Sequence, residues 1–72
     1  MEKKWKVYAC FHVDPKICEV TKRIIEDQTY YKPKVVGHGL DFAVYVGEYA
    51  DKERTEKVLS DLKKIGIYGI LV

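Results

Sequence analysis

The chain alternates apolar and polar residues in four short stretches and has a helical apolar pattern in two longer ones. The alternating stretches cover residues 5–12, about 34–36, about 40–48 and 68–72. Helical spacing follows Asp14 and Asp51. Because a period of two indicates strands and a period of 3.6 indicates helices, the expected order is strand–helix–strand–strand–helix–strand.

The segment boundaries carry their own signals. Asp14 and Asp51 can each accept hydrogen bonds from the free amide groups of a first helical turn. Pro15 suits the first helical position, because the N–H group that proline lacks would have no partner there. Gly66 can end the second helix. The Gly-His-Gly segment at 37–39 predicts the turn between the second and third strands.

The two halves of the chain repeat each other at an offset of 37 residues. Residues 5–8 (Trp-Lys-Val-Tyr) correspond to residues 42–45 (Phe-Ala-Val-Tyr), and Asp14 corresponds to Asp51. A single domain, 1–72, thus contains two strand–helix–strand half-repeats, about 5–36 and 42–72. Right-handed crossovers then predict an α+β, ferredoxin-like fold, in which a four-stranded antiparallel sheet carries both helices on one face. The first and third strands should be central, and the second and fourth should form the edges.

Strict alternation assigns each residue of the central strands to one face. The residues expected to face the helices are Trp5, Val7, Ala9, Phe11, Phe42, Val44 and Val46. Those expected on the opposite, open face are Lys6, Tyr8, Cys10, His12, Ala43, Tyr45 and Gly47, with Tyr49 continuing the same parity. In the first helix, the residues at inward spacing are Ile17, Cys18, Thr21, Ile24, Ile25 and Gln28.

A row of tyrosines beside small residues on the open face predicts a shallow binding platform. Flat rings can stack on sugar rings or on bases, and phenol hydroxyls can form hydrogen bonds. The alternative is that tyrosine is simply a good strand residue that tolerates half-exposure. The candidate ligand-binding residues are Lys6, Tyr8, His12, Tyr45 and Tyr49.

Composition narrows the class of protein. A hydrophobic fraction of 47% suffices for a packed core, and 13 Lys and Arg against 11 Asp and Glu give a net charge of only +2. That charge does not by itself indicate a polyanionic partner. No segment resembles a signal peptide or approaches the ~20 apolar residues of a membrane span. We expect a cytoplasmic location if the chain is full length, and the cell envelope if it is a domain of a larger exported protein.

Reactive chemistry is weakly represented. Two cysteines make no disulfide framework, and a Cys10–Cys18 bridge would require a chance meeting of a strand and the following helix. We therefore expect reduced thiols. His12 could act as a general base or ligand, but no nucleophile or carboxylate stands at a recognisable spacing from it, and His38 should be solvated in a turn. The sequence predicts no catalytic group, no metal and no cofactor, and hence not an enzyme.

Residues 42–53 (Phe-Ala-Val-Tyr-Val-Gly-Glu-Tyr-Ala-Asp-Lys-Glu) resemble the repeat signature of SPOR (sporulation-related repeat) domains. That signature is aromatic-x-Val-x-Val-Gly-x-aromatic-x-Asp/Ser-Lys-Glu. An apolar helical triad follows, here Thr55, Val58 and Leu62, and then Lys-Lys-x-Gly at 63–66. The first copy resembles the signature more loosely, with Cys10 in place of a glycine and His12 in place of an aromatic residue.

The SPOR resemblance implies both a fold and a function. The fold would be the strand order deduced above. The function would be non-catalytic recognition of peptidoglycan glycan strands that lack stem peptides, on the open sheet face. The ligand positions implied by the resemblance are Tyr8, His12 and Tyr45, with Lys6 near an edge.

Two further functions remain open at this stage. RNA-recognition-motif proteins share the strand order and stack bases on the first and third strands, so a single-stranded nucleic acid is one alternative ligand. The other is a protein partner or a homodimer, as in a small regulator or inhibitor of bacterial or phage origin. Either edge strand could then accept a partner strand.

Overall fold

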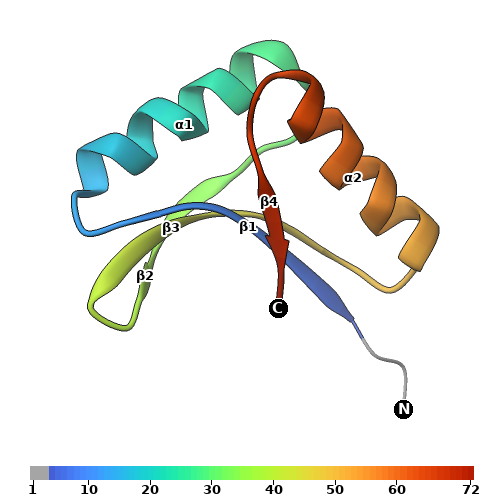
Figure 1. The fold of residues 1–72 in the computed structure, drawn as a ribbon, viewed down its shortest axis with the longest axis horizontal. Helices are drawn as coiled ribbons and strands as arrows, with labels where there is room; N and C mark the ends of the chain where they lie inside the picture. Colours follow the sequence, from blue (N-terminus) through green and yellow to red (C-terminus); the bar gives the residue numbers. More distant parts are fainter. Residues whose placement is uncertain (1–3) are drawn as a thin grey trace.

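The computed structural model describes residues 4–72 and confirms the expected α+β fold (Figure 1). Its elements are β1 (Trp5–His12), α1 (Pro15–Gln28), β2 (Lys34–His38), β3 (Asp41–Tyr49), α2 (Lys52–Lys64) and β4 (Gly69–Leu71). The strands form one antiparallel sheet in the order β2-β3-β1-β4. Figure 1 shows both helices on the same side of this sheet. The other side is the open face.

Both helices begin where the sequence predicts. The Asp14 carboxylate accepts a hydrogen bond from the Lys16 amide, and the Asp51 carboxylate accepts one from the Glu53 amide, each at 2.9 Å. Gly66, with φ +80°, follows the end of α2. Within residues 4–72, no helix is both long enough and apolar enough to span a membrane.

The hairpin between β2 and β3 is tighter than expected. Gly37 and His38 belong to β2, where they pair with Phe42 and Asp41 of β3. The turn is made by Gly39 and Leu40, and Gly39 has the positive φ (+62°) that glycine adopts at little cost. The second strand therefore runs two residues beyond the predicted end at 36.

The core fills the space between the sheet and the helices. Its buried residues are Val7, Ala9, Cys18, Ile25, Val44, Val46, Val58 and Leu62. The first helix contributes only Cys18 and Ile25, seven positions apart. The predicted inward positions Ile17 and Ile24 are 44% and 37% exposed, because no further layer covers the flanks of α1.

The pairing of β1 with β3 is interrupted twice. Val7 pairs with Gly47, but Tyr8 pairs with Tyr45, so β3 carries one extra residue there. Further along, Ala9 pairs with Val44 but His12 pairs with Phe42, so β1 carries one extra residue. These are β-bulges, which break the alternation of side chains between the two faces. The β1 bulge contains Cys10, whose φ is +52°.

Candidate functional site

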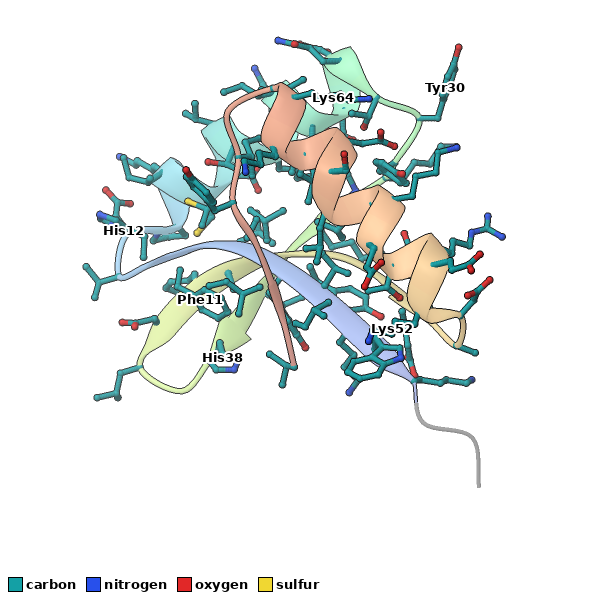
Figure 2. All side chains as sticks on the ribbon, turned by 45° about the vertical axis from the view of Figure 1, so that its right-hand side comes forward. Phe11, His12, Tyr30, His38, Lys52 and Lys64 are labelled. Atoms are coloured by element: carbon teal, nitrogen blue, oxygen red, sulfur yellow. The ribbon has the colours of Figure 1, made fainter. Side chains whose placement is uncertain are left out.

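Four aromatic rings from three strands meet on the open face. The ring centroids of Tyr8 lie 5.3 Å from Tyr45, 5.9 Å from Phe11 and 5.8 Å from His38, and those of Phe11 and His38 lie 5.1 Å apart. Figure 2 shows Phe11 and His38 on the side of the sheet away from the helices. We call Tyr8, Phe11, His38 and Tyr45 the open-face cluster.

The two tyrosines of this cluster lie where alternation predicts. Tyr8 stands between Val7 and Ala9, whose side chains are fully buried in the core, so its own side chain points to the open face. Tyr45 is its direct partner on β3. Lys6, two residues before Tyr8, is exposed and pairs with Glu48.

Phe11 joins the cluster because of the β1 bulge. Strict alternation places Phe11 toward the helices and Cys10 on the open face, and both assignments are wrong. Cys10 packs against the core, and its carbonyl oxygen accepts a hydrogen bond from the Cys18 thiol at 3.0 Å. The left-handed backbone at Cys10 thus turns the next side chain to the open face. Sequence periodicity alone contains no signal for this change.

His38 was also missed as a candidate residue, because the sequence places it in a solvated turn. It is the last residue of β2, pairs with Asp41 and keeps an exposed side chain. Extending the alternation Lys34, Val36 through Gly37 would have assigned His38 to the face of Tyr45. Gly37 and Gly39 instead favoured the prediction of a turn at this position.

Two predicted candidates, His12 and Tyr49, do not lie on the open face. His12 pairs with Phe42, which packs against the core, and its Nδ1 accepts a hydrogen bond from the Asp14 amide at 2.9 Å. Tyr49 also packs against the core. A Cβ added at Gly47 would lie 2.6 Å from the Tyr49 hydroxyl, so both face the helices. The β1 bulge changes the face of His12, and the β3 bulge changes the face of Tyr49.

The open face also buries a residue of its own. Ala43, predicted to be exposed, is fully buried although it is not part of the core beneath the helices. It shares the face of Tyr45 and pairs with Val36 of β2. Side chains of the open face therefore cover it, and the open-face cluster stands on a small apolar layer rather than on bare backbone.

The charges on the strands of the open face cancel. Lys6 pairs with Glu48, and the second lysine, Lys34, pairs with Tyr45. Asp41 of β3, the partner of His38, carries a negative charge that offsets the positive charge of Lys34. Burial raises the pKa of Tyr45, with a smaller contribution from Glu48, so its hydroxyl keeps its proton at neutral pH. The result is an aromatic surface that is close to neutral and has hydrogen-bonding groups at its rim.

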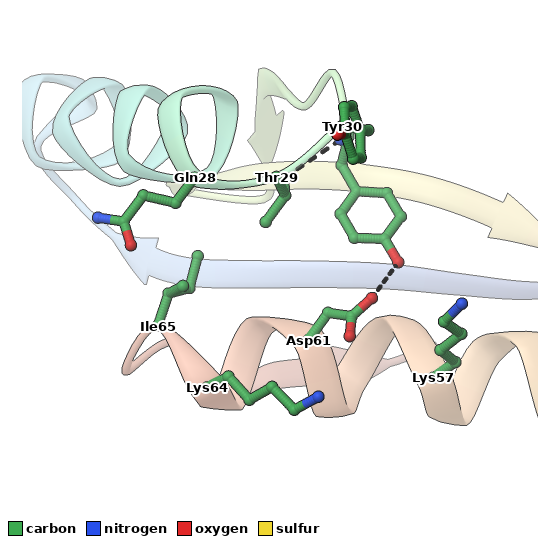
Figure 3. A pocket seen from close by; sticks show the side chains of 8 residues that line it. Gln28, Thr29, Tyr30, Lys57, Asp61, Lys64 and Ile65 are labelled. Carbon is green, nitrogen blue, oxygen red and sulfur yellow. Dashed lines mark hydrogen bonds between the residues drawn. The ribbon is translucent and has the colours of Figure 1, made fainter.

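A second concave region lies on the helix side. A cavity of about 380 Å³ separates the end of α1 from α2, between residues that include Gln28, Lys57 and Lys64 (Figure 3). Here the Tyr31 hydroxyl donates a hydrogen bond to Asp61 at 2.8 Å. Burial, followed by this bond, raises the pKa of Tyr31 to about 12. These two polar groups are engaged with each other, so they link α2 to the segment after α1.

No metal centre is formed by the residues that the structure describes, since no group of three or more His, Cys, Asp or Glu side chains gathers there. The arrangement on the open face is suited to binding by ring contacts and hydrogen bonds. No nucleophile is paired with a base in the open-face cluster.

Comparison with known proteins supports the fold. No family model and no curated protein sequence matches the chain. Among solved structures, the chain is similar to the solution structure of the peptidoglycan binding domain of the B. subtilis cell wall lytic enzyme CwlC. The TM-score is 0.81 at 14% identity, over 96% of this chain and 86% of that one. The two domains therefore share a fold.

Proposed function

We propose that this domain is a non-catalytic, SPOR-like module that binds peptidoglycan glycan strands on its open face. The observation that carries the proposal is the open-face cluster, a near-neutral group of four rings on the face that the helices leave uncovered. The fold shared with a peptidoglycan binding domain supports the same ligand class. The matching location would be the cell envelope, reached as part of an exported protein.

The chemistry of a glycan fits this surface. Sugar rings present C–H groups that pack against the electron-rich faces of aromatic rings. The rings of Tyr8 and Tyr45 are tilted by 51° and those of Phe11 and His38 by 75°, so the surface is ridged rather than flat. A ridged surface suits a chain of puckered sugars better than a row of planar bases. The Tyr45 hydroxyl and the Lys6 ammonium can bind sugar hydroxyl and amide groups.

The cancelling charges favour a glycan over a nucleic acid. Binding of a single strand relies on several cations that neutralise phosphates, and it weakens steeply as salt increases. On the open face, Lys6 and Lys34 stand against Glu48 and Asp41. A peptidoglycan strand stripped of stem peptides carries one lactyl carboxylate per disaccharide, a lower charge density than one phosphate per nucleotide, so it needs fewer unbalanced cations than a nucleic acid does.

Co-sedimentation with amidase-treated peptidoglycan tests the proposal. We expect the domain to pellet with the stripped glycan, with a weaker dependence on salt than nucleic-acid binding would show. Single-stranded RNA should not bind in the same buffer. Failure of the folded domain to pellet would overturn the proposal, and salt-sensitive RNA binding would favour the nucleic-acid reading instead.

Substitutions distinguish the open face from the rest of the surface. Phe11→Ala and Tyr45→Ala should each weaken binding about fivefold or more, since a stacked aromatic side chain contributes about 1–3 kcal/mol. Tyr30→Ala is the matched control, because Tyr30 is a fully exposed tyrosine beside the helix-side cavity. Equal losses in all three variants would show that the open-face cluster is not the binding surface.

A further inference from the structure

The two cysteines lie against each other at the junction of β1 and α1. The Cys18 thiol is fully buried and donates a hydrogen bond to the Cys10 carbonyl oxygen at 3.0 Å, while the Cys10 side chain is half-buried. Burial raises the pKa of Cys18, and the neighbouring Cys10 side chain raises it further. The strand and the following helix therefore do bring the two cysteines together, which the sequence did not predict.

We propose that Cys10 and Cys18 are a redox-active pair that forms an intramolecular disulfide and fastens the β1 bulge to α1. Both residues hold free thiols in the structure. Two features favour a bond within one molecule. Cys18 is shielded from solvent, so no second protein molecule can reach it, and its nearest thiol is that of Cys10.

The oxidant we name is a small disulfide such as oxidised glutathione. The half-buried Cys10 thiol loses its proton to solvent and attacks one glutathione sulfur, which forms a mixed disulfide and releases the other glutathione as a thiol. Cys18 then loses its proton and attacks the Cys10 sulfur, which releases the second glutathione. Two protein thiols are oxidised to one disulfide while one glutathione disulfide is reduced to two thiols. Because burial disfavours the thiolate form of Cys18, this second step should accelerate as the pH rises.

The bond would act on the open face through the β1 bulge. Cys10 has the left-handed conformation that places Phe11 in the open-face cluster. A covalent link from Cys10 to the core of α1 restricts the alternative in which β1 straightens and Phe11 leaves the cluster. This link to ligand binding rests on the proposed function, whereas disulfide formation does not. An oxidising cell envelope would favour the linked form.

Oxidation of the isolated domain with glutathione disulfide tests the bond itself. We expect a monomer that has lost both free thiols and two hydrogen atoms. Trypsin cleaves after Lys6, Lys16 and Lys22, so peptides 7–16 and 17–22 should be joined before reduction and separate after it. Persistence of both thiols, a stable glutathione adduct at Cys10, or disulfide-linked dimers would each overturn the proposal.

Single-thiol variants and hydrogen exchange test the link to the bulge. Cys18→Ser keeps a donor toward the Cys10 carbonyl oxygen but should stop at the glutathione adduct. In the wild type, amide exchange at residues 10–12 should slow at least severalfold on oxidation. In Cys18→Ser it should not change. Equal exchange rates at residues 10–12 in the oxidised and reduced wild type would show that the disulfide does not restrict the β1 bulge.

Glycan binding separates this proposal from the proposed function. We expect the oxidised wild type to pellet with stripped peptidoglycan at least as well as the reduced wild type. In the oxidised form, the wild type should bind more tightly than Phe11→Ala. If the disulfide forms and slows amide exchange but the domain does not bind glycan, the proposed function is wrong and the disulfide proposal still holds. Weaker binding after oxidation would overturn the link between the disulfide and Phe11.

Discussion

Tyr8 and Tyr45 are direct partners across β1 and β3, and their ring centroids are 5.3 Å apart. Each occupies the same place in its half of the 37-residue repeat. The two equivalent tyrosines therefore meet at the centre of the sheet. This contact is the part of the open-face cluster that does not depend on the β1 bulge.

The Tyr8–Tyr45 contact should be measurable as a coupling energy. Aromatic pairs in such tilted arrangements contribute about 0.5–1.5 kcal/mol beyond burial. In a double-mutant cycle by urea unfolding, Tyr8→Ala and Tyr45→Ala should show a coupling in that range. The control cycle pairs Tyr8→Ala with Tyr30→Ala, whose effects should add. Additivity in both cycles would contradict a direct ring contact.

The β1 bulge makes an unusual demand on position 10. Because Cys10 has φ +52°, Cys10→Gly should remove backbone strain, whereas Cys10→Val should add it. We expect the valine variant to be about 1–2 kcal/mol less stable than the glycine variant. Urea unfolding measures the difference. Strand propensity alone predicts the opposite order, so a more stable valine variant would mean that the left-handed conformation is absent.

Gly47 is enclosed by Tyr49 on the helix side of β3. An added Cβ would lie 2.6 Å from the Tyr49 hydroxyl oxygen and 2.9 Å from the adjoining ring carbon. Gly47→Ala should therefore displace a ring that packs on the core, at a cost of about 1–3 kcal/mol in thermal or urea unfolding. Gly37→Ala is the matched control, since no atom beyond its two chain neighbours lies within 4 Å of its Cβ position. That substitution should change stability by less than about 0.5 kcal/mol. Equal effects at both positions would refute the packing of Tyr49.

The Tyr31–Asp61 hydrogen bond predicts an alkaline loss of stability. The folded state raises the pKa of Tyr31 to about 12, so folding favours the neutral phenol. Its contribution is complete below the unfolded pKa of ~10 and is lost as pH rises through the folded value. At neutral pH, Tyr31→Phe should cost about 1–2 kcal/mol, because Asp61 loses its donor.

Urea unfolding across the alkaline range checks this pH dependence. The stability gap between wild type and Tyr31→Phe should narrow between about pH 10 and about pH 12. Tyr30→Phe serves as the control, because Tyr30 is fully exposed and should give no gap at any pH. A constant gap for Tyr31→Phe would show that the phenol is not held neutral by the fold.

The sequence by itself determined the fold and the pair at its centre. Apolar periodicity and the caps at Asp14 and Asp51 indicate the elements, and the 37-residue repeat relates the two halves, so element order and the central strands follow from them. Tyr8 and Tyr45 followed as well, because the residues on either side of each of them are apolar and buried. These signals lie in the order of residues along the chain, which a single sequence contains in full.

Only the tertiary structure decided the composition of the open-face cluster. Each bulge adds one residue to one strand, and a side-chain period of two turns one added residue into a change of face. Phe11 thereby joins the cluster, while His12 and Tyr49 fall on the helix side. The meeting of Cys10 with Cys18 arises in the same way, because it depends on how α1 packs over the bulge. Strand pairing and helix packing fix these positions, and neither is encoded in the local pattern of apolar and polar residues.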